Sequence, residues 1–98
     1  SGSGVAYMFG MIEHMISGAT ALGLYEAAAR DLIAQTMLGA ATMTQRSDEP
    51  VGVLRERVTS KGGTTAQALA HFEEHHWQET IHGAMRAAYD RAGELARS

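Results

Sequence analysis

The segment best suited to chemistry runs from Ser60 to Thr65, with the sequence Ser-Lys-Gly-Gly-Thr-Thr. A helical spacing of apolar residues follows it, so the segment stands where a helix begins. Backbone N–H groups at a helix start lack an intrahelical acceptor, and the helix dipole favours negative charge there. The two glycines let a ligand approach the backbone closely, and the hydroxyls and Lys61 add donors and charge. The segment therefore predicts a site for a carboxylate or a phosphate.

A loop that leads into a capped helix is the alternative interpretation of these residues. Thr64 and Gln67 have the spacing of a capping box, in which Thr64 is the N-cap residue. A P-loop is excluded, because no Gly-Lys-Ser/Thr triplet stands at the required spacing. The residues alone leave both the anion site and the capped loop open.

Two further patterns resemble sites but lack a necessary part. Residues 71–75, His-Phe-Glu-Glu-His, match an H-x-x-E-H zinc motif, yet a third ligand would have to come from a distant helix, so we predict no metal site. Residues 1–4, Ser-Gly-Ser-Gly, match half of a dinucleotide fingerprint or an expression linker. The third glycine of the fingerprint is missing, because Tyr7 occupies its place, and no strand precedes the segment.

The elements that position these residues are helices, because the apolar residues recur at helical spacing and the sequence has one proline and little strand-like alternation. We predict an all-α fold of about five helices. Gly23 ends the first helix in a left-handed C-cap, and Asp48 caps the third, with Pro50 in its first turn. The expected ranges are 5–22, 26–46, a short helix after Asp48, a fourth from Thr64 or Thr65 to about His75-His76, and a fifth that carries Trp77 to Leu95.

Size and composition limit the class of protein. The 98 residues make one domain, and alanine is the commonest of the apolar residues that form 45% of the chain. Such a core is thin, so we expect oligomerisation to add burial. A net charge of −3 argues against a nucleic-acid partner. The most apolar stretch, 5–24, is too polar to span a membrane, and no signal peptide is visible, so we expect a cytoplasmic protein.

Three motifs together resemble the pyrroline-5-carboxylate reductases. Residues 1–7 resemble the SGSGPAY segment of that family, and residues 34–41, Ala-Gln-Thr-Met-Leu-Gly-Ala-Ala, resemble its AQTVLGAA segment. Residues 54–65, which end in Val-Thr-Ser-Lys-Gly-Gly-Thr-Thr, resemble its LRxxVTSPGGTT signature. The resemblance extends in order along the whole chain.

The resemblance implies that residues 1–98 are a C-terminal helical domain for dimerisation and substrate-carboxylate binding. The N-terminal Rossmann domain, which in the family binds NADP or NAD, is expected to be absent from this chain. Long helices would interlock in an intertwined homodimer, and a ring of dimers is a further possible assembly. The fragment alone is expected to be inactive, because the dinucleotide site lies in the other domain.

The resemblance also assigns roles to individual residues in reducing the C=N bond of 1-pyrroline-5-carboxylate to L-proline. Thr65 would assist protonation at the ring nitrogen, and the turn at Ser3 and Gly4 would lie near the nicotinamide. The substrate carboxylate would be held by Ser60, Gly62, Gly63, Thr64 and Thr65.

The chain departs from the family pattern at three places. Val5 and Lys61 stand where the family has proline, and residues 75–77, His-His-Trp, replace Gly-Gly-Phe. Two other functions therefore stay open beside the reductase. One is a divergent imine reductase, and the other is a non-catalytic helical dimerisation module.

Overall fold

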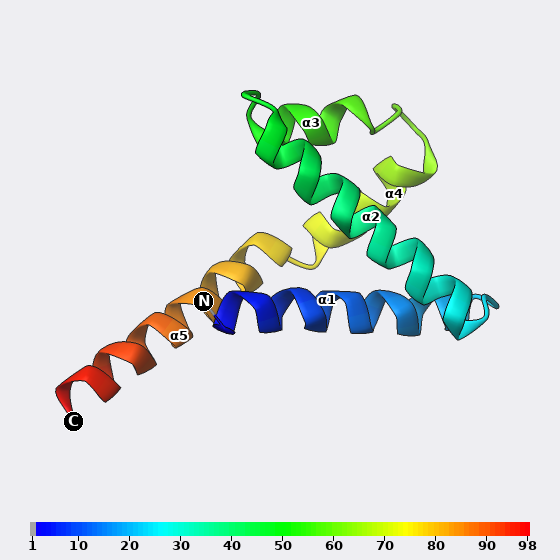
Figure 1. The fold of residues 1–98 in the computed structure, drawn as a ribbon. Coiled ribbons are helices and arrows are strands. Elements are labelled where there is room, and N and C mark those ends of the chain that lie inside the picture. Colours follow the sequence, from blue (N-terminus) through cyan, green and yellow to red (C-terminus); the bar gives the residue numbers. More distant parts are fainter. Residues whose placement is uncertain (1) are drawn as a thin grey trace. The chain divides into compact units, whose positions relative to one another are not determined.

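The computed structural model describes residues 2–98, in which every regular element is a helix (Figure 1). This confirms the predicted all-α class and the five helices. The chain divides into two units, residues 1–49 and 50–98. None of the helices in the described part is long and apolar enough to cross a membrane. The helices are α1 (Gly2–Ala21), α2 (Glu26–Arg46), α3 (Val51–Arg57), α4 (Thr64–Glu74) and α5 (Trp77–Arg97).

The first unit is a hairpin of α1 and α2 (Figure 1). Its turn depends on Gly23, whose φ of 105° lies in the left-handed region that glycine adopts without strain. The Gly23 N–H donates to the Thr20 carbonyl at 3.0 Å, and the Leu24 N–H donates to the Ala19 carbonyl at 3.1 Å. These two bonds make a Schellman motif and confirm the predicted C-cap.

Helix α1 begins three residues earlier than the predicted start at Val5. Apolar periodicity gave no signal there because Gly2, Ser3 and Gly4 carry no apolar side chain. The N–H groups of a first helical turn have no intrahelical acceptor in any sequence. Glycine and serine are therefore tolerated in this turn. Val5 consequently lies inside the helix, which forms without the family's proline.

Helix α2 has the predicted bounds, with Glu26 in its first turn and Arg46 in its last, as the helix dipole favours. Among residues 2–98, only its residues Ala29 and Ile33 are buried. Large apolar side chains elsewhere are exposed, such as Phe9 at 67% and Met85 at 56%. The hydrophobic core of the single chain is therefore very small.

The predicted start of α3 is wrong. Pro50, not Asp48, is the N-cap residue, and its carbonyl accepts the first helical bond from the Val53 N–H at 2.9 Å. A residue before proline is held out of the α region, so Glu49 cannot form the first turn that an Asp48 cap requires. Proline suits the N-cap position because the N–H group that it lacks would have no intrahelical acceptor there.

The junction of α4 and α5 contains an unusual backbone conformation. His76 has φ 58° and ψ 45°, a left-handed geometry for a residue with a Cβ atom. Its N–H donates to the Glu73 carbonyl at 3.1 Å. Trp77 follows, and its indole Nε1 donates to Glu73 Oε1 at 2.7 Å while its ring stacks on Phe72 at a centroid distance of 4.5 Å. These contacts hold the left-handed turn in place.

Replacing His76 by glycine is expected to stabilise the fold. Glycine adopts the left-handed region without steric cost, so His76→Gly should raise the free energy of unfolding by about 0.5–1 kcal/mol. The contact between His76 Nδ1 and Glu79 Oε2, 2.9 Å long, is lost, but both side chains are exposed and the contact contributes little. Thermal unfolding measures the change. His75→Gly is the matched control, since φ at His75 is −101°, and an equal gain in that variant would contradict the explanation.

Candidate functional site

The candidate site begins with a tight turn from Ser60 to Gly63. The Gly63 N–H donates to the Ser60 carbonyl at 3.0 Å, and Gly62 at the third position has φ 74°. Lys61 at the second position is not among the described residues with positive φ, so the turn is of type II. The turn aims the chain directly into α4.

The N-terminus of α4 has no side-chain cap among the residues that the structure describes. The predicted capping box is wrong: Gly63 is the N-cap residue, and Thr64 is the first helical residue. The Gln67 N–H donates to the Gly63 carbonyl at 3.2 Å, which leaves the N–H groups of Thr64, Thr65 and Ala66 without an intrahelical acceptor. Three donors therefore point out of the helix start, where the dipole favours an anion.

Gly63 is closely packed against Ser60, which favours glycine here more than its backbone angles do. A Cβ atom at this position would lie 3.3 Å from both the Cβ atom and the carbonyl oxygen of Ser60. Gly63 has φ −86°, which any residue adopts, whereas Gly62 has the positive φ. The two glycines thus serve different needs, one steric and one conformational.

The turn geometry gives a stability prediction for Lys61. Proline is favoured at the second position of a type II turn, and the turn's hydrogen bond is donated by Gly63, so Lys61→Pro removes no donor from it. We expect Lys61→Pro to raise the free energy of unfolding by about 0.4–1 kcal/mol, because proline restricts the unfolded chain. Thermal unfolding measures it. Gly62→Pro, at φ 74°, should destabilise instead, and a gain in both variants would refute the turn assignment.

The structure brings together all five residues predicted to bind the substrate carboxylate. Ser60, Gly62 and Gly63 form the turn, and Thr64 and Thr65 open α4. Ser3 and Gly4, predicted to lie near a cofactor, belong to the first turn of α1 rather than to a non-helical turn. Ser1 of that motif lies outside the described residues.

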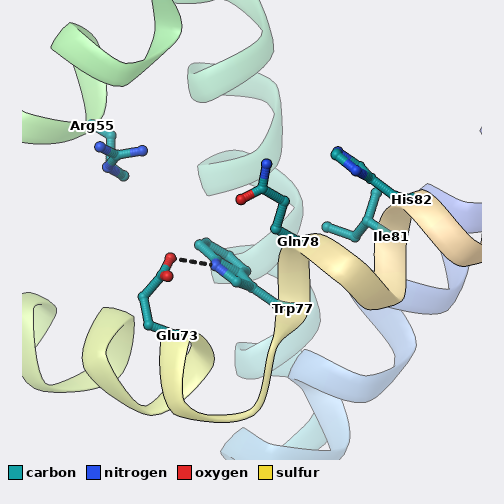
Figure 2. Close-up of a pocket in the computed structure, with 6 residues that line it drawn as sticks. All are labelled: Arg55, Glu73, Trp77, Gln78, Ile81 and His82. Atoms are coloured by element: carbon teal, nitrogen blue, oxygen red, sulfur yellow. Dashed lines mark hydrogen bonds between the residues drawn. The ribbon is translucent and has the colours of Figure 1, made fainter.

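Sequence reasoning missed one donor and one groove. Ala66 offers an N–H group to the site, but assigning the N-cap one residue too late concealed it. The groove has a volume of about 320 Å³ and lies in the second unit (Figure 2). No residue spacing in the sequence predicted this groove, because the residues that line it come from three different helices. They are Arg55 of α3, Glu73 of α4, and Trp77, Gln78, Ile81 and His82 of α5.

The histidines of the zinc-like motif lie together at the C-terminal end of α4, where His71 is in the last turn and His75 is the C-cap residue. The rings of His71 and His75 stack with centroids 4.2 Å apart. In residues 2–98, no group of three or more histidine, cysteine or acidic side chains is arranged to hold a metal ion. The distant third ligand that a catalytic zinc site requires is therefore not supplied within the described chain.

The chain matches known proteins over nearly its whole length. A family model described as pyrroline-5-carboxylate reductase dimerisation matches residues 1–95. The pyrroline-5-carboxylate reductase of Haemophilus influenzae is 47% identical over 96 residues, covering 97% of this chain and 35% of the relative. The Arabidopsis thaliana enzyme is 43% identical over 98 residues, covering all of this chain and 36% of the relative. The chain thus spans about a third of the length of these curated relatives.

Solved structures agree with the sequence matches. The pyrroline-5-carboxylate reductase of Coxiella burnetii has a TM-score of 0.91 and 43% identity, over 95% of this chain and 34% of that one. The Plasmodium falciparum pyrroline carboxylate reductase, solved with NADP bound, has a TM-score of 0.90 and 34% identity, over 93% of this chain and 35% of that one. The matched family is a dimerisation domain, which supports homodimer formation. On these matches, the chain belongs to the pyrroline-5-carboxylate reductase dimerisation family.

Proposed function

We propose that this domain binds the carboxylate of 1-pyrroline-5-carboxylate in an NAD(P)H-dependent reductase that produces L-proline. One observation carries the proposal: the uncapped start of α4 presents three N–H groups directly after a glycine turn. A carboxylate there would accept hydrogen bonds from these groups and would lie at the positive end of the helix dipole. The ligand would complete the cap that no side chain of the described residues provides.

Each residue of the site has a proposed part in this binding. The backbone of Gly62 and Gly63 would let the carboxylate approach closely, and the Ser60 and Thr64 hydroxyls would add donors. The Thr65 hydroxyl would lie near the ring nitrogen and assist its protonation as the C=N bond is reduced. Lys61, exposed at the corner of the turn, would add positive charge to the approach of an anionic substrate.

The bound dinucleotide would supply the hydride for the reduction. Ser3 and Gly4 would contribute a small part of the dinucleotide contacts. A Cβ atom added at Gly4 would meet nothing within 4 Å, so the first turn of α1 is open to close approach. These two small residues offer no group that would recognise an adenine or a ribose. We propose that another domain of the intact reductase binds most of NADP or NAD.

We further propose that two copies form an intertwined homodimer. Among the described residues only Ala29 and Ile33 are buried, and large apolar side chains of α1 are exposed, such as Phe9 at 67%. Exposed apolar surface of this kind is typical of a protein–protein interface. Helix α1 is apolar on most sides and has no buried residue, so a second copy is the natural cover for it. A ring of such dimers is a further proposal, as is a cytoplasmic location.

The test uses the full natural polypeptide that carries this domain. Oxidation of NADPH and of NADH is followed by the loss of the absorbance of the reduced nicotinamide with 1-pyrroline-5-carboxylate as substrate, and L-proline is identified as the product. Turnover that depends on the substrate supports the reductase. A folded dimer that binds the dinucleotide and reduces a different cyclic imine would indicate a divergent imine reductase. A folded dimer that binds neither compound would indicate a non-catalytic dimerisation module.

A further inference from the structure

We propose that His71, in the last turn of α4, and His75, the C-cap residue of that helix, form a two-histidine chelating site for a divalent transition metal. The two residues stand one helical turn apart, so their side chains leave the helix on the same side. Their rings already lie together, with centroids 4.2 Å apart and planes 27° apart. Two imidazoles are thus gathered at one point of the surface by the helix itself.

The hydrogen bond of His75 defines which nitrogen is available to a metal. Nδ1 of His75 lies 2.8 Å from the His71 carbonyl oxygen. A carbonyl oxygen only accepts, so the proton of a neutral His75 is on Nδ1 and the lone pair is on Nε2. Metal-binding histidines commonly donate their second ring N–H to a backbone carbonyl in this way. His75 therefore has the tautomer and the support of a metal ligand.

His71 is the side chain that would rotate to let both rings coordinate one metal. A metal lies about 2.0–2.1 Å from each imidazole nitrogen and in the plane of each ring, so the two planes must open beyond their present angle. His71 is exposed, and exposed side chains change rotamer within nanoseconds. Rotation of His71 about its side-chain bonds opens the angle while His75 keeps its bond to the carbonyl.

The ligand set selects the class of metal. Neutral imidazole suits copper, nickel and zinc, and the order of divalent affinities places Cu²⁺ highest. The described residues provide no third side chain for the site, so water occupies the remaining positions. This site differs from the catalytic zinc site that the H-x-x-E-H pattern suggests, because it needs neither a third protein ligand nor a general base.

A bound metal would fasten the last turn of α4. The two ligands span residues 71–75, directly before the left-handed turn at His76, and α4 carries the proposed anion site at its other end. A metal that binds the helical geometry and not the unfolded chain stabilises the helix by a free energy that rises with the logarithm of the metal concentration above its dissociation constant. The site would thus couple metal availability to the order of α4.

The test is a titration of the full chain with Cu²⁺ alone at neutral pH, followed by electron paramagnetic resonance. We expect one Cu²⁺ per chain with nitrogen ligands, and at least about a tenfold loss of affinity in His71→Ala and in His75→Ala. The matched control is the double variant Ala70→His with His71→Ala, which keeps two histidines but spaces them at i, i+5 on different faces of the helix. This variant should bind as weakly as the single variants, while His82→Ala should bind like the unmodified chain.

Three results would overturn the proposal. One is equally tight Cu²⁺ binding by the variant with the altered spacing, and another is an equal loss of affinity in His82→Ala. The third is a Cu²⁺-dependent increase in molar mass by light scattering, which would indicate a metal held between copies. Far-UV circular dichroism of each variant checks that the helices are retained, so that a loss of affinity reports the ligands.

Discussion

Thr65→Ala should lower kcat of the proposed full-length reductase about 100-fold while leaving KM for 1-pyrroline-5-carboxylate nearly unchanged. Proton transfer by a positioned group contributes about 10²–10⁴-fold, and the proposed role of the Thr65 hydroxyl is to assist protonation at the ring nitrogen. The carboxylate is proposed to be held mainly by backbone N–H groups, which the substitution retains. An interaction made only in the transition state changes kcat rather than KM.

Two variants separate the hydroxyl from the helix. Thr65→Ser keeps the hydroxyl and should retain most of the activity. Thr44→Ala removes a hydroxyl that donates to the Ala40 carbonyl of its own helix, at 2.8 Å, and should behave like the unmodified enzyme. Steady-state rates at several substrate concentrations give kcat and KM separately. If Thr65→Ala kept full kcat and raised KM alone, the hydroxyl would be a binding group and not a proton-transfer group.

Phe9→Asp should raise the dimer dissociation constant by about a thousandfold. Phe9 is 67% exposed in the single chain and lies in a groove of about 420 Å³ between α1 and α2, together with Ile12 and Ile16. Burying such a side chain contributes about 1.5–3 kcal/mol, and a symmetric dimer contains it twice. Since about 1.4 kcal/mol corresponds to a factor of ten, the two losses give the expected change. Burying a carboxylate adds to it.

Sedimentation over a range of protein concentrations measures this dissociation constant. Phe9→Leu is the conservative control, because it keeps an apolar side chain at the same place and should remain dimeric. Circular dichroism at the same concentrations should show that helix content falls together with the loss of dimer. A Phe9→Asp protein that sediments as a dimer at the lowest concentration would show that the partner does not cover this face of α1.

The helices were predictable because their signals are repeated along the chain. The bounds of α2 and the C-cap at Gly23 agree with the structure. Apolar residues at helical spacing indicate a helix, and a glycine directly after such a run indicates a left-handed C-cap. The caps at Asp48 and Thr64 were not predictable in this way. A cap depends on the backbone angles of single residues, and Pro50 and Gly63 displace both predicted caps.

The candidate site was predictable as a segment but not as a set of donors. The glycines and hydroxyls of residues 60–65 indicate the site in the sequence. The Ala66 N–H belongs to the set of free donors only because Gly63 is the N-cap residue. The residue type at position 76 gave no signal for the left-handed turn, because glycine is the usual residue in that conformation and histidine stands there instead. The signal available was the family's Gly-Gly-Phe, which this chain replaces at residues 75–77. Contacts with neighbouring residues, such as the Glu73–Trp77 bond, maintain that turn.

The two buried residues of the described chain, Ala29 and Ile33, have a consequence for how this protein exists in a cell. In the proposed homodimer, so small a core would make folding and pairing one equilibrium of second order in chain concentration. Dilution alone would then unfold the domain, and its melting temperature would rise with protein concentration. A freshly made copy is exposed to proteases until it meets another. Where two versions of the chain are made together, mixed pairs would form, so a version that pairs but is inactive would lower the activity of the other.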